Sequence, residues 1–148
     1  MNKSLLAGCV AAAAMVGLAP TCASAHEGTE KVTPALQQPI PNVPGKSLIA
    51  VVVDYPPGAA SPAHVHAKSG FIYAYVVSGS IESQVNDGPK QILRAGESFY
   101  EPPGATHTVS RNASKTEPAK LLAVFVVDTG DTPLTTPISP SKPLEKKQ

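Results

Sequence analysis

Three histidines in the middle of the chain have the spacing of metal ligands. His64 and His66 lie two positions apart in a stretch that follows Pro56-Pro57-Gly58. On a strand, both side chains point to the same face, and their Cα atoms lie roughly 7 Å apart. His107 follows a Pro-Pro-Gly turn and begins another expected strand. If that strand faces the first pair, three neutral imidazoles can bind one divalent ion: iron, zinc, nickel, copper or manganese.

Glu101 is the acidic residue that we single out as the candidate catalytic group. It lies six residues before His107, immediately ahead of the Pro-Pro-Gly turn. If its side chain points inward, it could act as a general base or as a fourth metal ligand. The alternative is a solvated glutamate at a strand end. Strand alternation does not decide whether Glu101 faces inward or is solvated, because prolines and turns interrupt the alternation.

The two histidine segments resemble the two sequence motifs of the cupin superfamily. Gly58, five residues and His64-x-His66 are similar to the start of the first motif. Gly96, five residues, Pro102-x-Gly104, two residues and His107 are similar to the second motif through its histidine. Because both signatures occur in the right order and separation, the resemblance implies a small single-domain cupin barrel with a metal site.

The resemblance covers about residues 47–127 and departs from the family at the fourth ligand. Family members usually carry a metal-binding glutamate a few residues after the second histidine. Here those positions hold Gly70, Phe71 and Ile72, none of which can bind a metal. The resemblance therefore implies a three-histidine site and leaves the usual fourth ligand open.

A three-histidine site leaves open positions on the ion for water, dioxygen or a chelating substrate. Cupins without the carboxylate resemble the three-His dioxygenases of the superfamily. This implies a divalent-metal-dependent, dioxygenase-like enzyme acting on a small enolizable or dicarbonyl-like molecule. Three alternatives stay open: a non-enzymatic protein that binds a small ligand, a barrel that has lost its metal, and a structural barrel whose role is its dimer surface.

The rest of the chain must position these residues, and its pattern predicts an all-β fold. Short β-branched and apolar runs alternate with Gly, Pro, Asn and Asp turns, and no segment has a convincing helical pattern. We expect about eight strands: 47–55, the segment with His64 and His66, 71–77, 81–85, 90–93, 98–101, 106–110 and 121–128. This spacing predicts an antiparallel sandwich or barrel, which the resemblance narrows to a cupin-type jelly roll over residues 47–128.

Pro-punctuated segments flank the expected barrel on both sides. Residues 26–46 are predicted to form an extended N-terminal arm or a flexible leader, and residues 129–148 a Pro-rich tail that is extended or disordered.

Alternation within residues 71–77 separates two faces of one strand. The residues at even positions (Ile72, Ala74, Val76) are predicted to line the pocket. Those at odd positions (Phe71, Tyr73, Tyr75, Val77) would pack against the other sheet or against a partner chain. The second possibility, together with the resemblance, suggests a homodimer. A small apolar pocket suits a small-molecule ligand or substrate.

The N-terminus is typical of a secretory signal. Lys3 precedes an apolar run over residues 5–19, and Ala23-Ser24-Ala25 is a small-x-small cleavage site. Residues 1–25 are therefore predicted to be removed, and the protein to be periplasmic or secreted. Both cysteines fall in this leader. Of the twelve basic residues one is Lys3, so eleven balance eleven acidic residues in the remainder. Neither a nucleic-acid partner nor membrane attachment after cleavage is expected.

Overall fold

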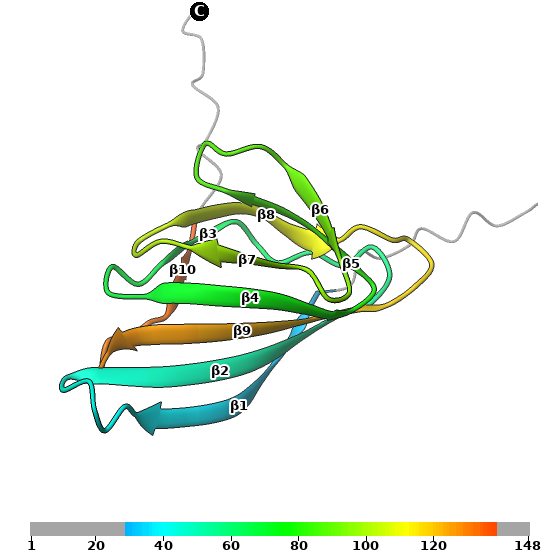
Figure 1. The fold of residues 1–148 in the computed structure, drawn as a ribbon. Helices are drawn as coiled ribbons and strands as arrows, with labels where there is room; N and C mark the ends of the chain where they lie inside the picture. Colours follow the sequence, from blue (N-terminus) through cyan, green and yellow to red (C-terminus); the bar gives the residue numbers. More distant parts are fainter. Residues whose placement is uncertain (1–28, 139–148) are drawn as a thin grey trace, which may run out of the picture.

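The chain forms two five-stranded antiparallel sheets that face each other, as a computed structural model shows for the described residues, 29–138 (Figure 1). The strands are β1 (Lys31–Pro39), β2 (Lys46–Tyr55), β3 (His64–His66), β4 (Phe71–Ser78), β5 (Ser80–Val85), β6 (Gln91–Arg94), β7 (Ser98–Glu101), β8 (Thr106–Asn112), β9 (Ala119–Asp128) and β10 (Thr135–Pro137). The first sheet has the order β1-β2-β9-β4-β7, and the second has the order β10-β3-β8-β5-β6. The expected all-β jelly roll is confirmed.

The eight expected strands are all present, and two further strands come from the flanking segments. β1 lies in the expected N-terminal arm and pairs with β2 at the edge of the first sheet. β10 lies in the expected tail and pairs with β3 at the edge of the second sheet. Within the described range, the flanking segments are therefore extended but integrated into the sheets. The predicted signal segment, 1–25, lies outside the described residues.

The core lies between the two sheets and is built from their inward-facing apolar side chains. Its largest fully buried members are Tyr55, Ile72, Val76, Ile81 and Val127. Each fully buried aliphatic side chain contributes roughly 1.5–3 kcal/mol through its removal from water. This interior holds the facing strands in a fixed relation to each other.

The structure confirms which residues of β4 face inward and which face outward. Ile72, Ala74 and Val76 point inward and are completely buried. They belong to the packed core and do not line the main cavity, because the cavity lies against β1, β2 and β9. Phe71, Tyr73 and Val77 are exposed on the outer face of the sheet and do not pack against the other sheet.

Gly79 makes the abrupt connection from β4 to β5. Its φ of 70° lies in the left-handed region, which favours glycine. A Cβ atom there would lie 2.5 Å from the Pro118 carbonyl oxygen and 2.8 Å from the Ala119 Cα. The turn therefore depends on the absence of a side chain, which lets β5 start close against the beginning of β9.

Within residues 29–138 there is no helix with the length and apolarity that a membrane crossing requires.

Candidate metal centre

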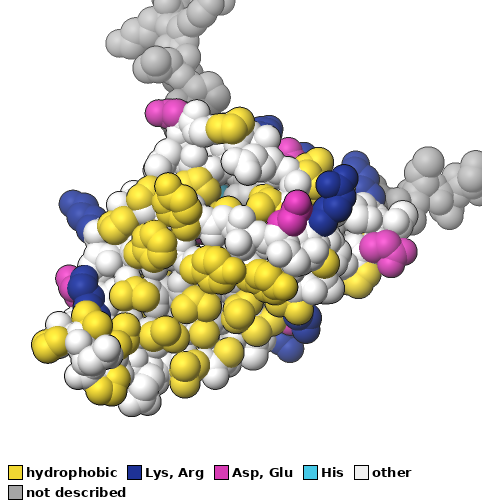
Figure 2. Space-filling view, in the orientation of Figure 1, with side chains coloured by type: hydrophobic (Ala, Val, Ile, Leu, Met, Phe, Trp, Pro, Cys, Tyr) yellow, Lys and Arg dark blue, Asp and Glu magenta, His cyan; other side chains and the backbone are white. Residues whose placement is uncertain are grey.

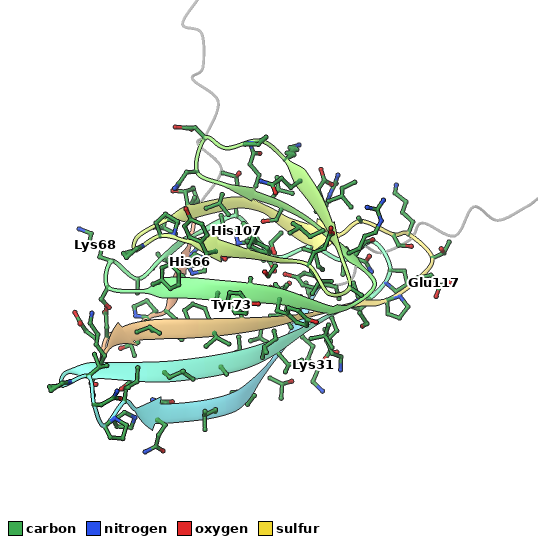
Figure 3. The ribbon with its side chains drawn as sticks, in the orientation of Figure 1. Lys31, His66, Lys68, Tyr73, His107 and Glu117 are labelled. Carbon is green, nitrogen blue, oxygen red and sulfur yellow. The ribbon has the colours of Figure 1, made fainter. Side chains whose placement is uncertain are left out.

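The three histidines converge because β3 and β8 are direct neighbours. His64 on β3 pairs with His107 on β8, so these two side chains share a face of the sheet. His66, two positions along β3, points the same way. One nitrogen from each ring lies within 4.8 Å of the other two. His66 and His107 are labelled near each other in Figure 3. The structure thus brings together His64, His66 and His107, as the sequence predicted.

His64 is held in the form that a metal ligand requires. Its Nδ1 lies 2.7 Å from the Pro62 carbonyl oxygen, so Nδ1–H donates to that oxygen and Nε2 keeps its lone pair. Burial lowers the pKa of His64, and the neighbouring His66 and His107 lower it further, against the opposing effect of the Pro62 carbonyl. The ring is therefore neutral at pH 7 and able to bind a cation.

His107 is anchored by a hydroxyl on the adjacent strand. Its Nε2 lies 2.9 Å from Ser83 Oγ, and both side chains are buried. Nδ1 faces the Glu101 carboxylate at 3.2 Å, so in the metal-free protein Nδ1 carries the proton and Nε2 accepts from the Ser83 hydroxyl; a bound cation would replace that proton. Sequence reasoning did not identify Ser83. Its parity on β5, where Ile81 and Ser83 both face inward, was the available signal.

Glu101 lies among the histidines and is not solvated. The residue is 3 % exposed, and its Oε2 is 2.8 Å from His66 Nε2 and 3.2 Å from His107 Nδ1. It points inward because it pairs directly with the buried Ile72 on β4. Glu101 thus lies directly across the sheet from Ile72, the last of the three positions (70–72) compared above with the family's glutamate.

The electrostatics of Glu101 favour the charged carboxylate. Burial by itself would raise the pKa, but contacts with His107 and His66 outweigh it and lower the pKa to about 2. Glu101 is therefore an anion at neutral pH. It adds a negative charge next to the imidazole nitrogens, where a cation would lie.

The unsatisfied polar atoms at this site fit a bound ion. Both ring nitrogens of His66 and Oε2 of Glu101 are buried without a partner in hydrogen-bonding geometry, although His66 Nε2 and Oε2 approach to 2.8 Å. Buried polar groups normally have partners, because leaving one unpaired costs about 1–3 kcal/mol. Nitrogens bound to one ion at about 2.1 Å lie closer together than 4.8 Å, so modest side-chain rotation would complete the site.

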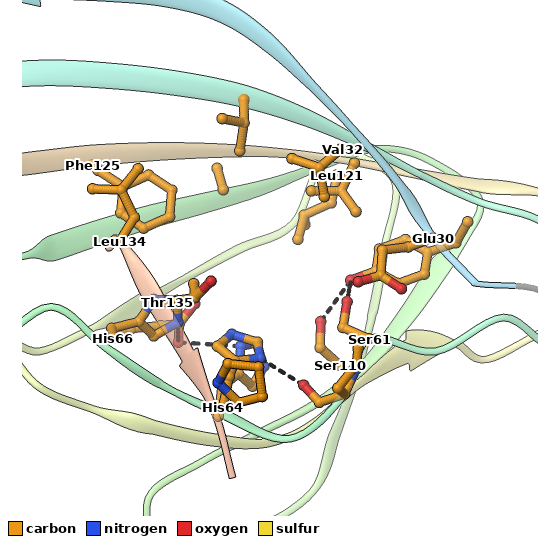
Figure 4. A pocket seen from close by; sticks show the side chains of 18 residues that line it. Glu30, Val32, Ser61, His64, His66, Ser110, Leu121, Phe125, Leu134 and Thr135 are labelled. Atoms are coloured by element: carbon orange, nitrogen blue, oxygen red, sulfur yellow. Dashed lines mark hydrogen bonds and ion pairs between the residues drawn. The ribbon is translucent and has the colours of Figure 1, made fainter. Parts of the chain in front are cut away.

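The cluster opens into a cavity of about 320 Å³ between the sheets (Figure 4). Its walls are mostly aliphatic and come from β2 and β9, with Phe125 near the ring of His66. Leu134, Thr135 and Pro137 from the C-terminal segment and Val32 from β1 complete the lining. Sequence reasoning missed these four, because the flanking segments carry no strand signal strong enough to override their prolines.

The cupin motifs noted in the sequence are matched by a family model. The model, described as a cupin domain, matches residues 51–125. That range contains every candidate metal ligand and Glu101. No curated protein sequence matches the chain.

Solved structures share the fold. A conserved protein with a double-stranded β-helix domain from Klebsiella pneumoniae is 22 % identical with a TM-score of 0.59, over 76 % of this chain and 87 % of that one. The protein TT1209 from Thermus thermophilus is 25 % identical with a TM-score of 0.55, over 67 % and 84 %. Oxalate oxidase in complex with the substrate analogue glycolate is 25 % identical with a TM-score of 0.51, over 69 % and 52 %.

Proposed function

This chain belongs to the cupin domain family, and from that premise we propose that it is a divalent-metal-dependent enzyme acting on a small organic molecule. One observation carries the proposal: three histidines and a buried, charged Glu101 surround one point at the wall of a mostly apolar cavity. The ligands would be His64, His66 and His107. A bound ion would supply Lewis acidity or redox chemistry at open coordination positions.

Glu101 is proposed as the general base of this site. Its carboxylate is ionised at pH 7, faces the imidazoles and is shielded from bulk water. A substrate that enters the cavity with an acidic C–H or O–H group at the histidine cluster could transfer that proton to Oε2. The other proposed role, a fourth metal ligand, uses the same oxygen, so one substitution tests both.

The likeness to oxalate oxidase supports an oxidative reaction. That protein was solved with glycolate, a small molecule with two oxygen donors. This chain covers about half of it, so the likeness concerns the barrel and its centre. We propose substrates that present two adjacent oxygens, such as enolizable carbonyl compounds, to the three histidines.

Metal content and a single substitution test this function. Purified protein should contain about one divalent ion per chain or take one up, measured by elemental analysis after iron, zinc, nickel, copper or manganese is supplied. His64→Ala should abolish uptake with an unchanged circular dichroism spectrum, because His64 lies at the cavity wall outside the packed core. Lys68→Ala, an exposed neighbour, is the matched control. A folded parent protein that takes up none of these metals would refute the proposal.

A binding protein of the same fold is the second candidate. The observation that favours it is the residues at 70–72, which replace the glutamate usual in the family with glycine, phenylalanine and isoleucine. Oxygen uptake with diketones or phenolic compounds separates the two. Turnover that Glu101→Gln removes supports the enzyme, whereas metal-dependent binding without turnover supports the binder.

We further propose a homodimer formed through the outer face of the first sheet. Figure 2 shows hydrophobic side chains gathered over this face, and Phe71, Tyr73, Val77 and Tyr100 are exposed on it. Phe71 and Tyr100 stack with ring centroids 5.8 Å apart. Exposed apolar patches of this kind mark interaction sites. Sedimentation of the parent protein should show a dimer and that of Tyr73→Lys a monomer. A monomeric parent would refute this.

Export is proposed from the first 25 residues. Expression of the full chain should yield a periplasmic or secreted protein that begins at His26, as read by N-terminal sequencing. Ala25→Tyr should block cleavage. Recovery of the full-length chain from the cytoplasm in both cases would contradict the proposal.

A further inference from the structure

A cluster of hydroxyl groups forms the end of the cavity away from the histidines (Figure 4). The Tyr55 hydroxyl lies 2.8 Å from Ser61 Oγ and 2.9 Å from Ser110 Oγ. Tyr55 and Ser110 are buried, and all three residues line the cavity. Glu30 lines the same end, so the cavity has a second polar region in addition to the metal centre.

The hydroxyl cluster has a hydrogen-bond donor to spare. Three hydroxyls carry three protons, and the two contacts between them use two. Within the described part of the chain these hydroxyls make no other hydrogen bond. Burial raises the pKa of Tyr55, against the opposing effect of its two serine partners, so the phenol stays protonated at neutral pH. The remaining proton and lone pairs are available to a ligand in the cavity.

A β-bulge in β8 directs Ser110 into the cavity together with His107. Residues three apart on a regular strand face opposite sides. Here Val85 pairs with His107 and Gln84 with Val109, so Thr108 is an extra residue on β8. The bulge changes the alternation, and both His107 and Ser110 are buried. The two groups thus lie on one wall, roughly 10 Å apart along the strand.

The wall between the two polar ends is apolar. Val53, Leu121 and Ala123 line it, and Val51 extends it towards Phe125 near the histidines. Among residues 29–138, those lining the cavity include no lysine or arginine, whereas Glu30 supplies a carboxylate at the hydroxyl end. A neutral hydroxyl or an amino group can be accommodated there. A second carboxylate on the ligand would meet repulsion from Glu30 and find no cation.

We propose that Tyr55, Ser61 and Ser110 form a recognition subsite for a hydroxyl group at the far end of the substrate. Resting on the proposed metal function, this assigns a substrate class: an oxygen-chelating head, an apolar ring or short chain in the middle, and a hydroxyl tail. The cavity of about 320 Å³ lies at the lower end of the range for small-molecule sites, which suits a molecule with one aromatic ring.

Hydroxamic acids that differ only at the tail test the subsite on zinc-loaded protein. Acetohydroxamic acid probes the head alone, benzohydroxamic acid adds the apolar middle, and 4-hydroxybenzohydroxamic acid adds the tail. We expect the 4-hydroxy compound to bind about three- to tenfold more tightly than benzohydroxamic acid by calorimetry, the worth of one net hydrogen bond. The 4-carboxy compound should bind more weakly than benzohydroxamic acid, and Glu30→Gln should reduce that penalty.

One near-isosteric variant that removes all three hydroxyls identifies the groups responsible. In Tyr55→Phe/Ser61→Ala/Ser110→Ala the preference for the 4-hydroxy compound should fall to about one, while zinc content and affinity for acetohydroxamic acid stay as in the parent. An unchanged preference in this variant, or no preference in the parent, would overturn the subsite and leave the hydroxyl cluster as a structural link between β2 and β8.

Failure of the metal site is distinguishable from failure of the subsite. A protein that takes up no zinc refutes the proposed function, and the subsite is then tested with 4-methylphenol against toluene, which need no metal. A preference for the phenol that is lost in Tyr55→Phe/Ser61→Ala/Ser110→Ala supports the subsite. Equal binding, or no binding of either probe, refutes it.

Discussion

Replacing Glu101 with glutamine removes a negative charge from the middle of the histidine cluster and keeps the size of the side chain. The carboxylate is buried and its pKa falls from 4.5 to about 2. At about 1.4 kcal/mol for each unit of pKa, this fall corresponds to roughly 3 kcal/mol of folding free energy in the metal-free protein at pH 7. Glu101→Gln should lose a stabilisation of that order.

The pH dependence of this loss has a definite sign. Because the folded-state pKa lies below the unfolded-state value, the stabilisation is fully present above pH 4.5 and is lost as the pH falls through about 2. The difference in unfolding free energy between parent and Glu101→Gln should therefore be greatest near pH 7. It should shrink to roughly half or less by about pH 3.

Urea unfolding of metal-free protein, measured at several pH values between 3 and 7, gives this difference directly. Glu117→Gln, at an exposed position on the loop before β9, is the matched control and should change stability little at any pH (Figure 3). A difference that does not vary with pH would refute the argument that histidine contacts hold Glu101 ionised. So would a variant more stable than the parent at pH 7, since the cost of burying the charge would then exceed its contacts.

Two further substitutions test the support of the site and of the fold. Ser83→Ala removes the hydroxyl that orients His107, and we expect metal affinity to fall about 10- to 100-fold with an unchanged fold, measured by competition with a chelator; unchanged affinity would contradict an orienting role. Gly79→Ala forces a Cβ atom against the Pro118 carbonyl at a positive φ and should lower the unfolding free energy by more than about 2 kcal/mol. Gly45→Ala, with a similar φ and open space, should cost only about 1 kcal/mol, and equal losses would show that backbone conformation alone matters.

The histidine cluster was predictable because it depends on residues that are close together in the sequence. His64 and His66 need only strand alternation to share a face, and the Pro-Pro-Gly turn fixes where the strand with His107 begins. The central strands were predictable for the same reason. Their β-branched runs are bounded by turn residues such as Asn86, which has a positive φ in the turn after β5.

The orientation of Glu101 depended on register, which is not local. Prolines after Glu101 remove the alternation that would have decided its face, and only its pairing with Ile72 turns it inward. The edge strands were missed for a related reason. Pro34 lies within β1, and β10 ends at Pro137, so the composition of both segments disfavours a strand prediction. They form strands because β1 pairs with β2 and β10 pairs with β3.

The extra residue in β8 separates two properties that strand geometry normally ties together: how far apart two side chains are, and whether they face the same way. Thr108 is exposed, so it can vary in type without entering the cavity, while its presence sets an odd spacing between His107 and Ser110. A barrel without it would have to place the second group two or four positions from the histidine. Gain or loss of a single residue at this point of the strand would thus change which side chain faces the cavity, and its distance from the histidines, without moving the histidines themselves.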